Sequence, residues 1–548
     1  MKYLKIIKRN KVAFKRLYLL PILILSCVNQ NKLSSLDDYI NSSLKDWDLP
    51  GLAVAVVLDD KIIYAKGFGI KEIGKNNKIN KKTLFQIGSV TKGFASASIA
   101  SLVDDGLVTW DDLVVKHLPW FKLKDVNVSN KITIRDLLAH TSDMPAHAYH
   151  SLEIIDELEV AKRAELLEIQ SSDKKYRYSN QAYGLIGLLV ESVTKKNWGD
   201  WLRKRIFEPL NMNNSFGSPY QIWDSSYVAP TFLGTAPSKN VSINNNLKLN
   251  VAMPHGKYRN TYRKVLPWQS YDNLQPAGSI VSNVVDMANW IRFHINEGKF
   301  ENQQVISKNN LLEMHKPQIE NIGYFLFADS TNEVKLGRAE GITSSKNYYG
   351  LGWSIGTFQR EVHLSHGGGI FGFPAFISFL PEKNAGVVVL ANGSLWTPYY
   401  PHHEITAYIY SKLFDLEQKD LHHIMMNKTN AIIDQVNSLY KTRNSQRNSS
   451  AKQTLPIEDY LGLYESKLAG PFEIKLEDTL LRLEFKGKGA FSGQLEHWYD
   501  NTFILYFDGG DGQAYESSLI TFIIENSKNV TGVDLGSFGR YNRILLNN

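Results

Sequence analysis

The chain has 548 residues, enough for more than one domain, and its 43% hydrophobic and 11% aromatic content is typical of a globular protein with a large core. The net charge of +7 comes from residues 1–26, which hold seven Lys and Arg residues and no acidic residue. Removing these seven from the 62 basic residues leaves 55, which equals the number of acidic residues. This balance argues against nucleic acid as a partner, because no basic excess remains to attract phosphates.

The N-terminal segment is typical of an export signal. Its basic residues precede an apolar run over 17–25, which is too short to span a membrane. Cys27, the only cysteine, follows this run, and the arrangement resembles a bacterial lipoprotein signal. We therefore expect a signal peptide over 1–26, lipidation of Cys27, and a lipid anchor in the bacterial cell envelope, facing the periplasm or the exterior. The alternative is an ordinary signal peptide or an uncleaved anchor with an incidental cysteine.

The next region predicts an α+β domain over 27–440. Apolar strands at 52–58 and 62–64 are followed by helices at 89–104, 134–140, 181–193 and 286–296, and strands return at 353–357, 374–380 and 386–391. Further helical patterns cover 405–414 and 431–440, and residues 217–275 are predicted to form a long surface excursion. Strands that open and close the domain predict an antiparallel sheet built from both ends and flanked by helices.

A small all-β domain is predicted over 456–548. Residues 441–455 are mostly polar and predict a linker. After them the pattern changes, because 472–476 and 481–485 alternate apolar and polar residues, which is typical of half-buried strands. No catalytic grouping is recognisable in this part of the chain.

The stretch Ser89-Val90-Thr91-Lys92 places a serine at the predicted N-terminus of a helix, with a lysine one turn later. A desolvated lysine can take the hydroxyl proton or assist its removal, and the helix N-terminus favours a developing oxyanion. Ser192-Val193-Thr194-Lys195 repeats the four letters, but it is predicted to lie in the last turn of a helix, where the carbonyl end disfavours an anion. Ser89 is therefore the candidate nucleophile.

Two further motifs follow in the order Tyr178-Ser179-Asn180 and His366-Gly367-Gly368-Gly369. With the Ser-x-x-Lys motif, the segment 133–142 and further stretches at 276–279, 349–353 and 386–392, they make the chain from about 49 to 411 resemble the serine β-lactamase-like family. This family includes class C β-lactamases, DD-carboxypeptidases, D-aminopeptidases and related esterases. The resemblance implies a β-lactamase/transpeptidase-like fold. The C-terminal domain resembles a lipocalin-like module that is often appended to such hydrolases.

The resemblance also implies roles for the motif residues. Ser89 would be acylated, and Lys92 and Tyr178 would handle protons, with the ammonium lowering the pKa of the phenol toward neutrality. Asn180 would hold Lys92 and the substrate amide. The N–H groups of Ser89 and Gly369 would form the oxyanion hole, while Gly367 and Gly368 would let the backbone approach the substrate. No metal or organic cofactor is implied.

His366 stands where many penicillin-active relatives have lysine. A mostly neutral imidazole attracts a substrate carboxylate less strongly, although protonation at lower pH would supply a charge. We therefore expect an acyl-enzyme hydrolase acting on a small ester, an amide or a cell-wall peptide such as a D-amino-acid peptide. The alternatives are a penicillin-binding carboxypeptidase or β-lactamase, and a catalytically silent cell-envelope binding protein.

Several other residues have a structural interpretation. We expect His140 to satisfy backbone or neighbouring groups, and Trp353 to lie in the core. The aromatic residues that either line a cleft or pack in the core are Trp268, Tyr271, Phe371 and Phe373. Asp143 stands where relatives commonly have glycine, and the sequence offers no physical account of this difference. The pairs at 402–403 and 422–423 place adjacent histidines on different helix faces, which argues against a metal site.

Overall fold

The computed structural model describes residues 32–145, 156–167, 169, 173–223, 228–230, 250–258, 261–265, 268–321, 334–335, 343–344, 347–370, 372–393, 400–417, 420–445, 447, 451–485, 492–507, 517–526, 528–536 and 539–544. The expected signal peptide, Cys27 and Phe371 lie outside these residues, as does much of the predicted excursion. None of the described helices is both long and apolar enough to cross a membrane.

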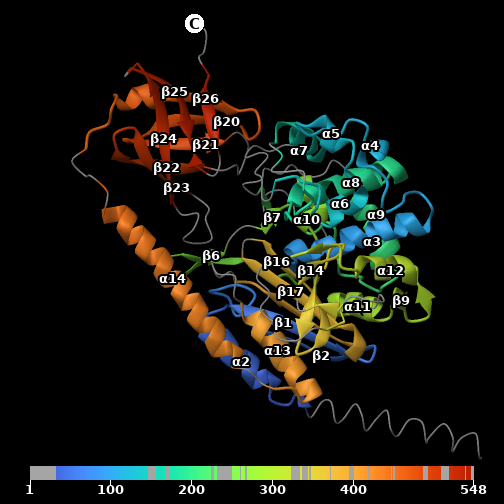
Figure 1. The fold of residues 1–548 in the computed structure, drawn as a ribbon. Helices are drawn as coiled ribbons and strands as arrows, with labels where there is room; N and C mark the ends of the chain where they lie inside the picture. The colour runs from blue at the N-terminus through green and yellow to red at the C-terminus, as the bar shows by residue number, and fades with distance from the viewer. Residues whose placement is uncertain are drawn as a thin grey trace, which may run out of the picture.

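An eight-stranded sheet organises the first domain (Figure 1). Its order is β11-β14-β15-β16-β17-β18-β1-β2, and the described pairs are antiparallel. The strands are β1 (Gly51–Leu58), β2 (Lys61–Gly69), β11 (Ile319–Glu320), β14 (Tyr348–Tyr349), β15 (Ser354–Phe358), β16 (Glu361–Ile370), β17 (Phe373–Leu380) and β18 (Ala385–Ala391). Because β1 pairs with β18, the first strand of the domain joins the last, which confirms a sheet built from both ends.

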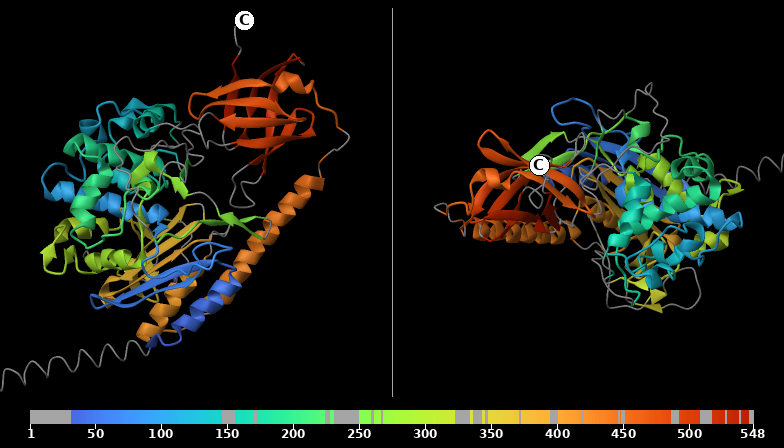
Figure 2. Two further views of the ribbon diagram at one scale, coloured as in Figure 1. Left: turned by 180° about the vertical axis from the view of Figure 1, so that it is seen from behind. Right: turned by 90° about the horizontal axis from the view of Figure 1, so that it is seen from above.

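Both faces of this sheet are covered by helices, so β1 is apolar at every position. Ala53, Ala55 and Val57 face a core that includes α3 (Thr91–Asp104), α8 (Asn180–Thr194) and α11 (Val284–Ile295). The alternate residues face a second core with α2 (Leu36–Asp46), α13 (Pro401–Phe414) and the start of α14 (Leu421–Ser445). Figure 2 shows these two helical layers on opposite sides of the sheet.

Shorter elements surround the first core. The helices are α4 (Val114–His117), α5 (Val126–Ser129), α6 (Ile134–Leu138), α7 (Glu157–Lys162), α9 (Trp198–Leu202), α10 (Gln275–Gly278) and α12 (Lys308–Met314). Short strand pairs join β3 (Phe85–Gln86) to β8 (Val281–Ser282), β4 (Val228–Pro230) to β7 (Trp268–Ser270), β5 (His255–Tyr258) to β6 (Thr261–Val265), β9 (Lys299–Phe300) to β10 (Gln303–Gln304) and β12 (Val334–Lys335) to β13 (Thr343–Ser344). Twelve of the 14 residues of α3 are buried, so this helix runs through the middle of the helical layer.

The C-terminal domain is a closed barrel of eight antiparallel strands (Figure 1). They are β19 (Gly462–Ser466), β20 (Gly470–Glu477), β21 (Leu480–Phe485), β22 (Ser492–Tyr499), β23 (Thr502–Phe507), β24 (Ser517–Glu525), β25 (Asn529–Asp534) and β26 (Arg540–Arg543). Aromatic side chains, including Phe472, Phe503 and Phe522, form its own core. The predicted linker begins later than expected, because α14 continues through Ser445.

Candidate active site

Ser89 lies in the 3-10 turn η1 (Gly88–Val90), directly before α3, and this turn packs against β16. A Cβ atom on Gly368 would lie 2.0 Å from the Ile87 carbonyl oxygen, and one on Gly88 would lie 2.6 Å from the Gly369 nitrogen. Gly88 also has a φ of +51°, which favours glycine. These glycines therefore let the backbone near Ser89 meet the backbone near Gly369, the two positions predicted to supply an oxyanion hole.

Lys92 is the second residue of α3, its side chain is fully buried, and its Nζ atom lies within hydrogen-bond distance of three groups. It lies 3.1 Å from Ser89 Oγ, 2.8 Å from Asn180 Oδ1 and 2.8 Å from the Ala277 carbonyl oxygen. Burial lowers the pKa of Lys92 well below its ordinary value. A neutral amine has two N–H groups for the two carbonyl-type acceptors, and its lone pair then faces the Ser89 hydroxyl.

Tyr178 stands two residues before α8, whose first turn is capped by the Ser179 side chain. The Lys92 Nζ atom lies 4.6 Å from the centroid of the Tyr178 ring. Burial raises the pKa of Tyr178, and a hydrogen bond with Ser89 opposes this effect only in part. The expectation that an ammonium lowers the phenol pKa is therefore wrong, because burial shifts both groups toward their uncharged forms.

His366 lies on β16 and is 6% exposed, and both nitrogen atoms of its ring have a hydrogen-bond partner. Its Nδ1 atom lies 2.6 Å from the Gly367 carbonyl oxygen, and its Nε2 atom lies 2.9 Å from the Tyr349 hydroxyl. A carbonyl only accepts, so Nδ1 carries the proton and Nε2 of the neutral ring accepts from Tyr349. Burial and the nearby Lys92 lower the pKa of His366 to about 3. Mild acid therefore does not charge this histidine, contrary to the expectation from its ordinary pKa.

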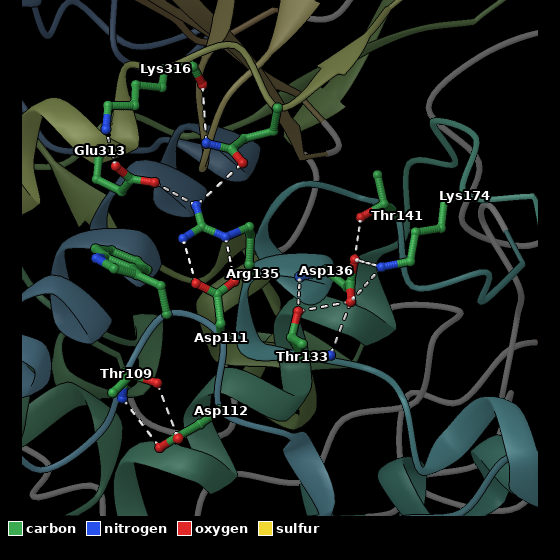
Figure 3. A network of polar contacts seen from close by, with 12 residues as sticks. Thr109, Asp111, Asp112, Thr133, Arg135, Asp136, Thr141, Lys174, Glu313 and Lys316 are labelled. Atoms are coloured by element: carbon green, nitrogen blue, oxygen red, sulfur yellow. Dashed lines mark hydrogen bonds and ion pairs between the residues drawn. The ribbon is translucent and has the colours of Figure 1, made fainter. Parts of the chain in front are cut away.

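The segment before Tyr178 is anchored to the end of α6 (Figure 3). Asp136 closes a capping box with Thr133, accepts a hydrogen bond from Thr141 and pairs with Lys174 at 3.1 Å. On the other side of α6, Arg135 binds both carboxylate oxygens of Asp111 and one of Glu313 (Figure 3). Through Asp136, the loop after α6 at Thr141 and the segment before Tyr178 at Lys174 are therefore held to the same helix.

The second Ser-Val-Thr-Lys copy closes α8, as its helical context predicts. The Ser192 hydroxyl donates to the Leu189 carbonyl, and the exposed Lys195 ammonium donates to the Ser192 carbonyl. Lys195 is the left-handed C-cap of the helix, with a φ of +60°. Both polar side chains therefore satisfy carbonyl groups at the end of the helix.

The structure assigns several aromatic residues to packing. Trp268 and Phe373 are fully buried with their ring centroids 5.1 Å apart, and Trp353 is buried against Gly93 of α3. Tyr271 is half-buried. Within the described residues, no three His, Cys, Asp or Glu side chains gather closely enough to hold a metal ion.

Sequence reasoning missed two partners of the site, Ala277 and Tyr349, and it expected His140 to satisfy backbone or neighbouring groups without identifying those groups. The first acts through its backbone carbonyl, which no side-chain motif reveals. Tyr349 and His140 lie in stretches that carry the family resemblance, so the resemblance was a signal for their importance. It gave no indication of the groups that they contact.

Comparisons with known proteins identify the family of the chain. Residues 36–407 match the family described as Beta-lactamase, and residues 446–542 match a domain of unknown function, DUF3471. Protein flp of Staphylococcus aureus (strain NCTC 8325 / PS 47) is 25% identical over 365 residues, which cover 65% of this chain and 62% of that protein. The chain therefore matches less than two thirds of the length of flp.

Unguisins hydrolase ungD' of Aspergillus campestris (strain IBT 28561) is 27% identical over 462 residues, which cover 78% of this chain and 74% of that protein. Among solved structures, the octameric penicillin-binding protein homologue from Pyrococcus abyssi superposes with a TM-score of 0.57 and 21% identity. That superposition covers 93% of this chain and 99% of the homologue and shows the shared fold. Since the family profile matches more than half of the residues, the chain belongs to the Beta-lactamase family.

Proposed function

We propose that the protein is an exported serine hydrolase that forms an acyl-enzyme on Ser89 and acts on a small ester, an amide or a D-amino-acid peptide. The observation that carries this proposal is the contact set of the Lys92 Nζ atom. Its two carbonyl-type neighbours, on Asn180 and Ala277, accept the N–H groups of a neutral amine. The remaining lone pair is then available to the Ser89 hydroxyl at 3.1 Å.

In the proposed acylation, Lys92 takes the Ser89 proton while Ser89 Oγ bonds to the substrate carbonyl carbon. The backbone N–H groups of Ser89 and Gly369 stabilise the negative carbonyl oxygen. Tyr178, kept as a phenol by burial, donates its proton to the leaving oxygen or nitrogen as the old bond to carbon breaks. The proton on Lys92 then returns to Tyr178, which leaves both side chains as they began.

Deacylation uses the same groups. A water molecule attacks the acyl carbon and gives its proton to Lys92, and the bond between that carbon and Ser89 Oγ breaks. Ser89 regains a proton from Lys92, and the carboxylic acid product leaves. The net reaction consumes one ester or amide and one water, and it requires no redox partner.

The environment of His366 supports a preference for substrates without a carboxylate near β16. With its Nδ1 proton directed at the Gly367 carbonyl and its Nε2 atom occupied by Tyr349, the neutral ring brings no positive charge. The Aspergillus campestris relative is named for the hydrolysis of unguisins, which supports a hydrolase with a substrate other than a penicillin. A penicillin-binding carboxypeptidase or β-lactamase is the second candidate, and the family match favours it.

The proposal is tested by labelling the full chain with a fluorophosphonate or a fluorescent penicillin, followed by peptide mapping. Ser89 is the expected labelled residue, and Ser89→Ala should abolish both labelling and hydrolysis of a p-nitrophenyl ester. Ser192→Ala is the matched control, because it removes the same hydroxyl from the second Ser-Val-Thr-Lys copy. Loss of activity in Ser192→Ala with retention in Ser89→Ala would overturn the assignment. Labelling by the penicillin with no ester hydrolysis would favour the second candidate.

Export and anchoring belong to the same proposal and rest on the N-terminal sequence. The mature protein should begin at a lipidated Cys27 and fractionate with membranes, and Cys27→Ala should release it or stall its processing. Intact-mass analysis tests this directly. An unmodified mature N-terminus at another residue would contradict lipidation.

A further inference from the structure

Tyr178 is flanked by two residues whose backbone N–H groups both reach His140. The N–H of Arg177 donates to the His140 carbonyl oxygen at 2.8 Å, and the N–H of Ser179 donates to the His140 Nδ1 atom at 3.0 Å. One residue therefore holds the chain immediately before and immediately after the candidate proton donor. The two bonds restrict how the backbone of Tyr178 can shift or rotate relative to α6.

The conformation of His140 makes this clamp possible. Its φ is +60°, a left-handed value that is uncommon outside glycine and enriched in Asn, Asp and His. This turn lets the carbonyl and the ring of one residue contact the same neighbouring segment. Because Nδ1 accepts a backbone N–H, the neutral ring carries its proton on Nε2. The His140 side chain is fully buried, so a water molecule would not readily take the place of Nδ1 as acceptor if the ring were removed.

The ring of His140 also packs directly on the ring of Tyr178. Their ring centroids are 4.3 Å apart. The ring of Tyr183, a residue of α8, has its centroid 4.9 Å from that of His140. The histidine thus contacts the tyrosine through its ring and holds both of its neighbours through hydrogen bonds.

We propose that His140 is a positioning residue that sets the place of the Tyr178 phenol relative to Ser89. This inference rests on the proposed function, in which Tyr178 transfers a proton. Proton transfer requires the donor within hydrogen-bond reach of the reacting atoms, and a displacement of about 1 Å at a reacting group can lower the rate on the order of 100-fold. Loss of the clamp should therefore reduce kcat, while substrate binding and KM change little.

The test compares two substitutions at His140 in the full chain. His140→Leu removes the acceptor, and His140→Asn retains one, because the Asn side-chain oxygen can occupy the place of Nδ1 and Asn tolerates a positive φ. Hydrolysis of p-nitrophenyl butyrate is measured per folded molecule, with thermal unfolding monitored in parallel. His140→Leu should lower kcat at least tenfold with KM nearly unchanged, and His140→Asn should recover most of that loss.

His255→Leu is the matched control. This histidine is also fully buried, and its Nε2 atom accepts the backbone N–H of Ile73 at 3.0 Å. Its loss should lower stability and leave kcat per folded molecule within about twofold of the wild type, because none of its bonds involves Tyr178. If His140→Leu behaves like this control, His140 has only a structural role and the inference is wrong.

Equal losses of kcat in His140→Asn and His140→Leu would also overturn the inference, because the acceptor would then not matter. Should His140→Leu fail to fold, His140→Asn still tests the claim, since a retained kcat with a lower melting temperature is expected. A failure of the proposed function is recognised separately. In that case the wild-type protein would neither be labelled at Ser89 nor hydrolyse the ester, whereas a failure of this inference leaves both intact.

Discussion

Asp143 and Arg177 form an ion pair of 2.7 Å, and the side chains are only 8% and 11% exposed. Asp143 has a φ of +59°, a left-handed value that glycine adopts without strain, which agrees with the glycine expected at this position from the family resemblance. Here the aspartate adopts the left-handed conformation and directs its carboxylate to the residue before Tyr178. Burial nevertheless raises the pKa of Asp143 despite the nearby guanidinium, so the desolvation cost offsets much of the attraction.

This relationship predicts non-additive effects of substitution. Asp143→Gly should be tolerated by the backbone and leaves the ion pair of Arg177 with Asp173 at 2.9 Å in place. Arg177→Met leaves the Asp143 carboxylate nearly buried beside an apolar side chain. We expect the double variant to lose about 1 kcal/mol less unfolding free energy than the sum of the two single variants. Urea unfolding followed by tryptophan fluorescence measures this coupling, and simple additivity would mean that the pair contributes no coupling energy.

The pKa of Lys92 predicts the pH dependence of acylation. Only the neutral amine can take the Ser89 proton, and burial lowers the pKa of Lys92 well below its ordinary value. The value of kcat/KM for a neutral ester should therefore rise with pH through this lowered pKa and then reach a plateau. The raised pKa of Tyr178 keeps the phenol protonated, so no decline is expected below about pH 10.

Lys92→Met should remove this activity, and Lys195→Met is the matched control because it alters the same position of the second copy. The control should keep both the rate and the pH profile. The same shift predicts a stability effect, since the unfolded chain binds a proton at Lys92 that the folded chain does not hold. Stability should rise with pH up to the ordinary lysine pKa of about 10.4. A value of kcat/KM that falls as the pH rises from 5.5 to 9 would contradict a role for Lys92 as the base.

The neutral state of His366 predicts how substrate choice can be changed. His366→Lys should raise acylation by nitrocefin relative to a neutral p-nitrophenyl ester by about 1 kcal/mol, or roughly fivefold, because a fixed charge would meet the carboxylate. Lowering the pH from 8 to 5.5 should not mimic this effect in the wild type, since the pKa of His366 is about 3. An unchanged ratio in His366→Lys would show that this position does not face a substrate carboxylate.

Tyr349→Phe tests the contribution of the Tyr349 hydroxyl to the state of His366. It removes the hydroxyl that donates to His366 Nε2 while it keeps the aromatic ring. We expect it to leave the His366 ring free to turn, while burial still keeps the ring uncharged. The ratio of nitrocefin to neutral ester should therefore change by the same factor at every pH between 5.5 and 8. Tyr176→Phe is the control, because its hydroxyl bonds Asn321 and its ring packs in the same cluster 5.4 Å from Tyr349. Equal behaviour of the two variants would mean that the Tyr349 hydroxyl does not set the state of His366.

The order of strand and helix patterns was sufficient to predict the sheet and the helices that flank it, and helical spacing predicted the closeness of Ser89 and Lys92. Helix polarity distinguished the two Ser-Val-Thr-Lys copies, because only one precedes a helix. The protonation states could not be predicted in this way. They depend on the burial of Lys92, on the desolvation of the Tyr178 phenol, and on a hydroxyl from β14 that meets His366 across the sheet. The clamp by His140 depends on a loop dihedral that no local pattern specifies.

The C-terminal barrel should be dispensable for folding and for hydrolysis of a small ester. Its core is a separate cluster, and β19 pairs with β26 to close the barrel on itself. Within the described residues, its contacts with the rest of the chain include a hydrogen bond of 3.2 Å from Arg163 to the Leu468 carbonyl and the packing of Arg443 on Trp498. Such contacts at a domain boundary contribute little compared with a closed apolar core.

A protein ending at Gln453 should therefore unfold cooperatively and keep kcat for p-nitrophenyl butyrate within about twofold of the full chain. Leu468 packs half-buried against the first core, so the truncation exposes a small apolar area and should lower the melting temperature by a few degrees at most, on the order of 2 °C. Leu468→Asp in the full chain is the control, because it disturbs this contact without removing the barrel. If the truncated protein loses cooperative unfolding while Leu468→Asp retains it, the barrel as a whole completes the fold of the hydrolase domain.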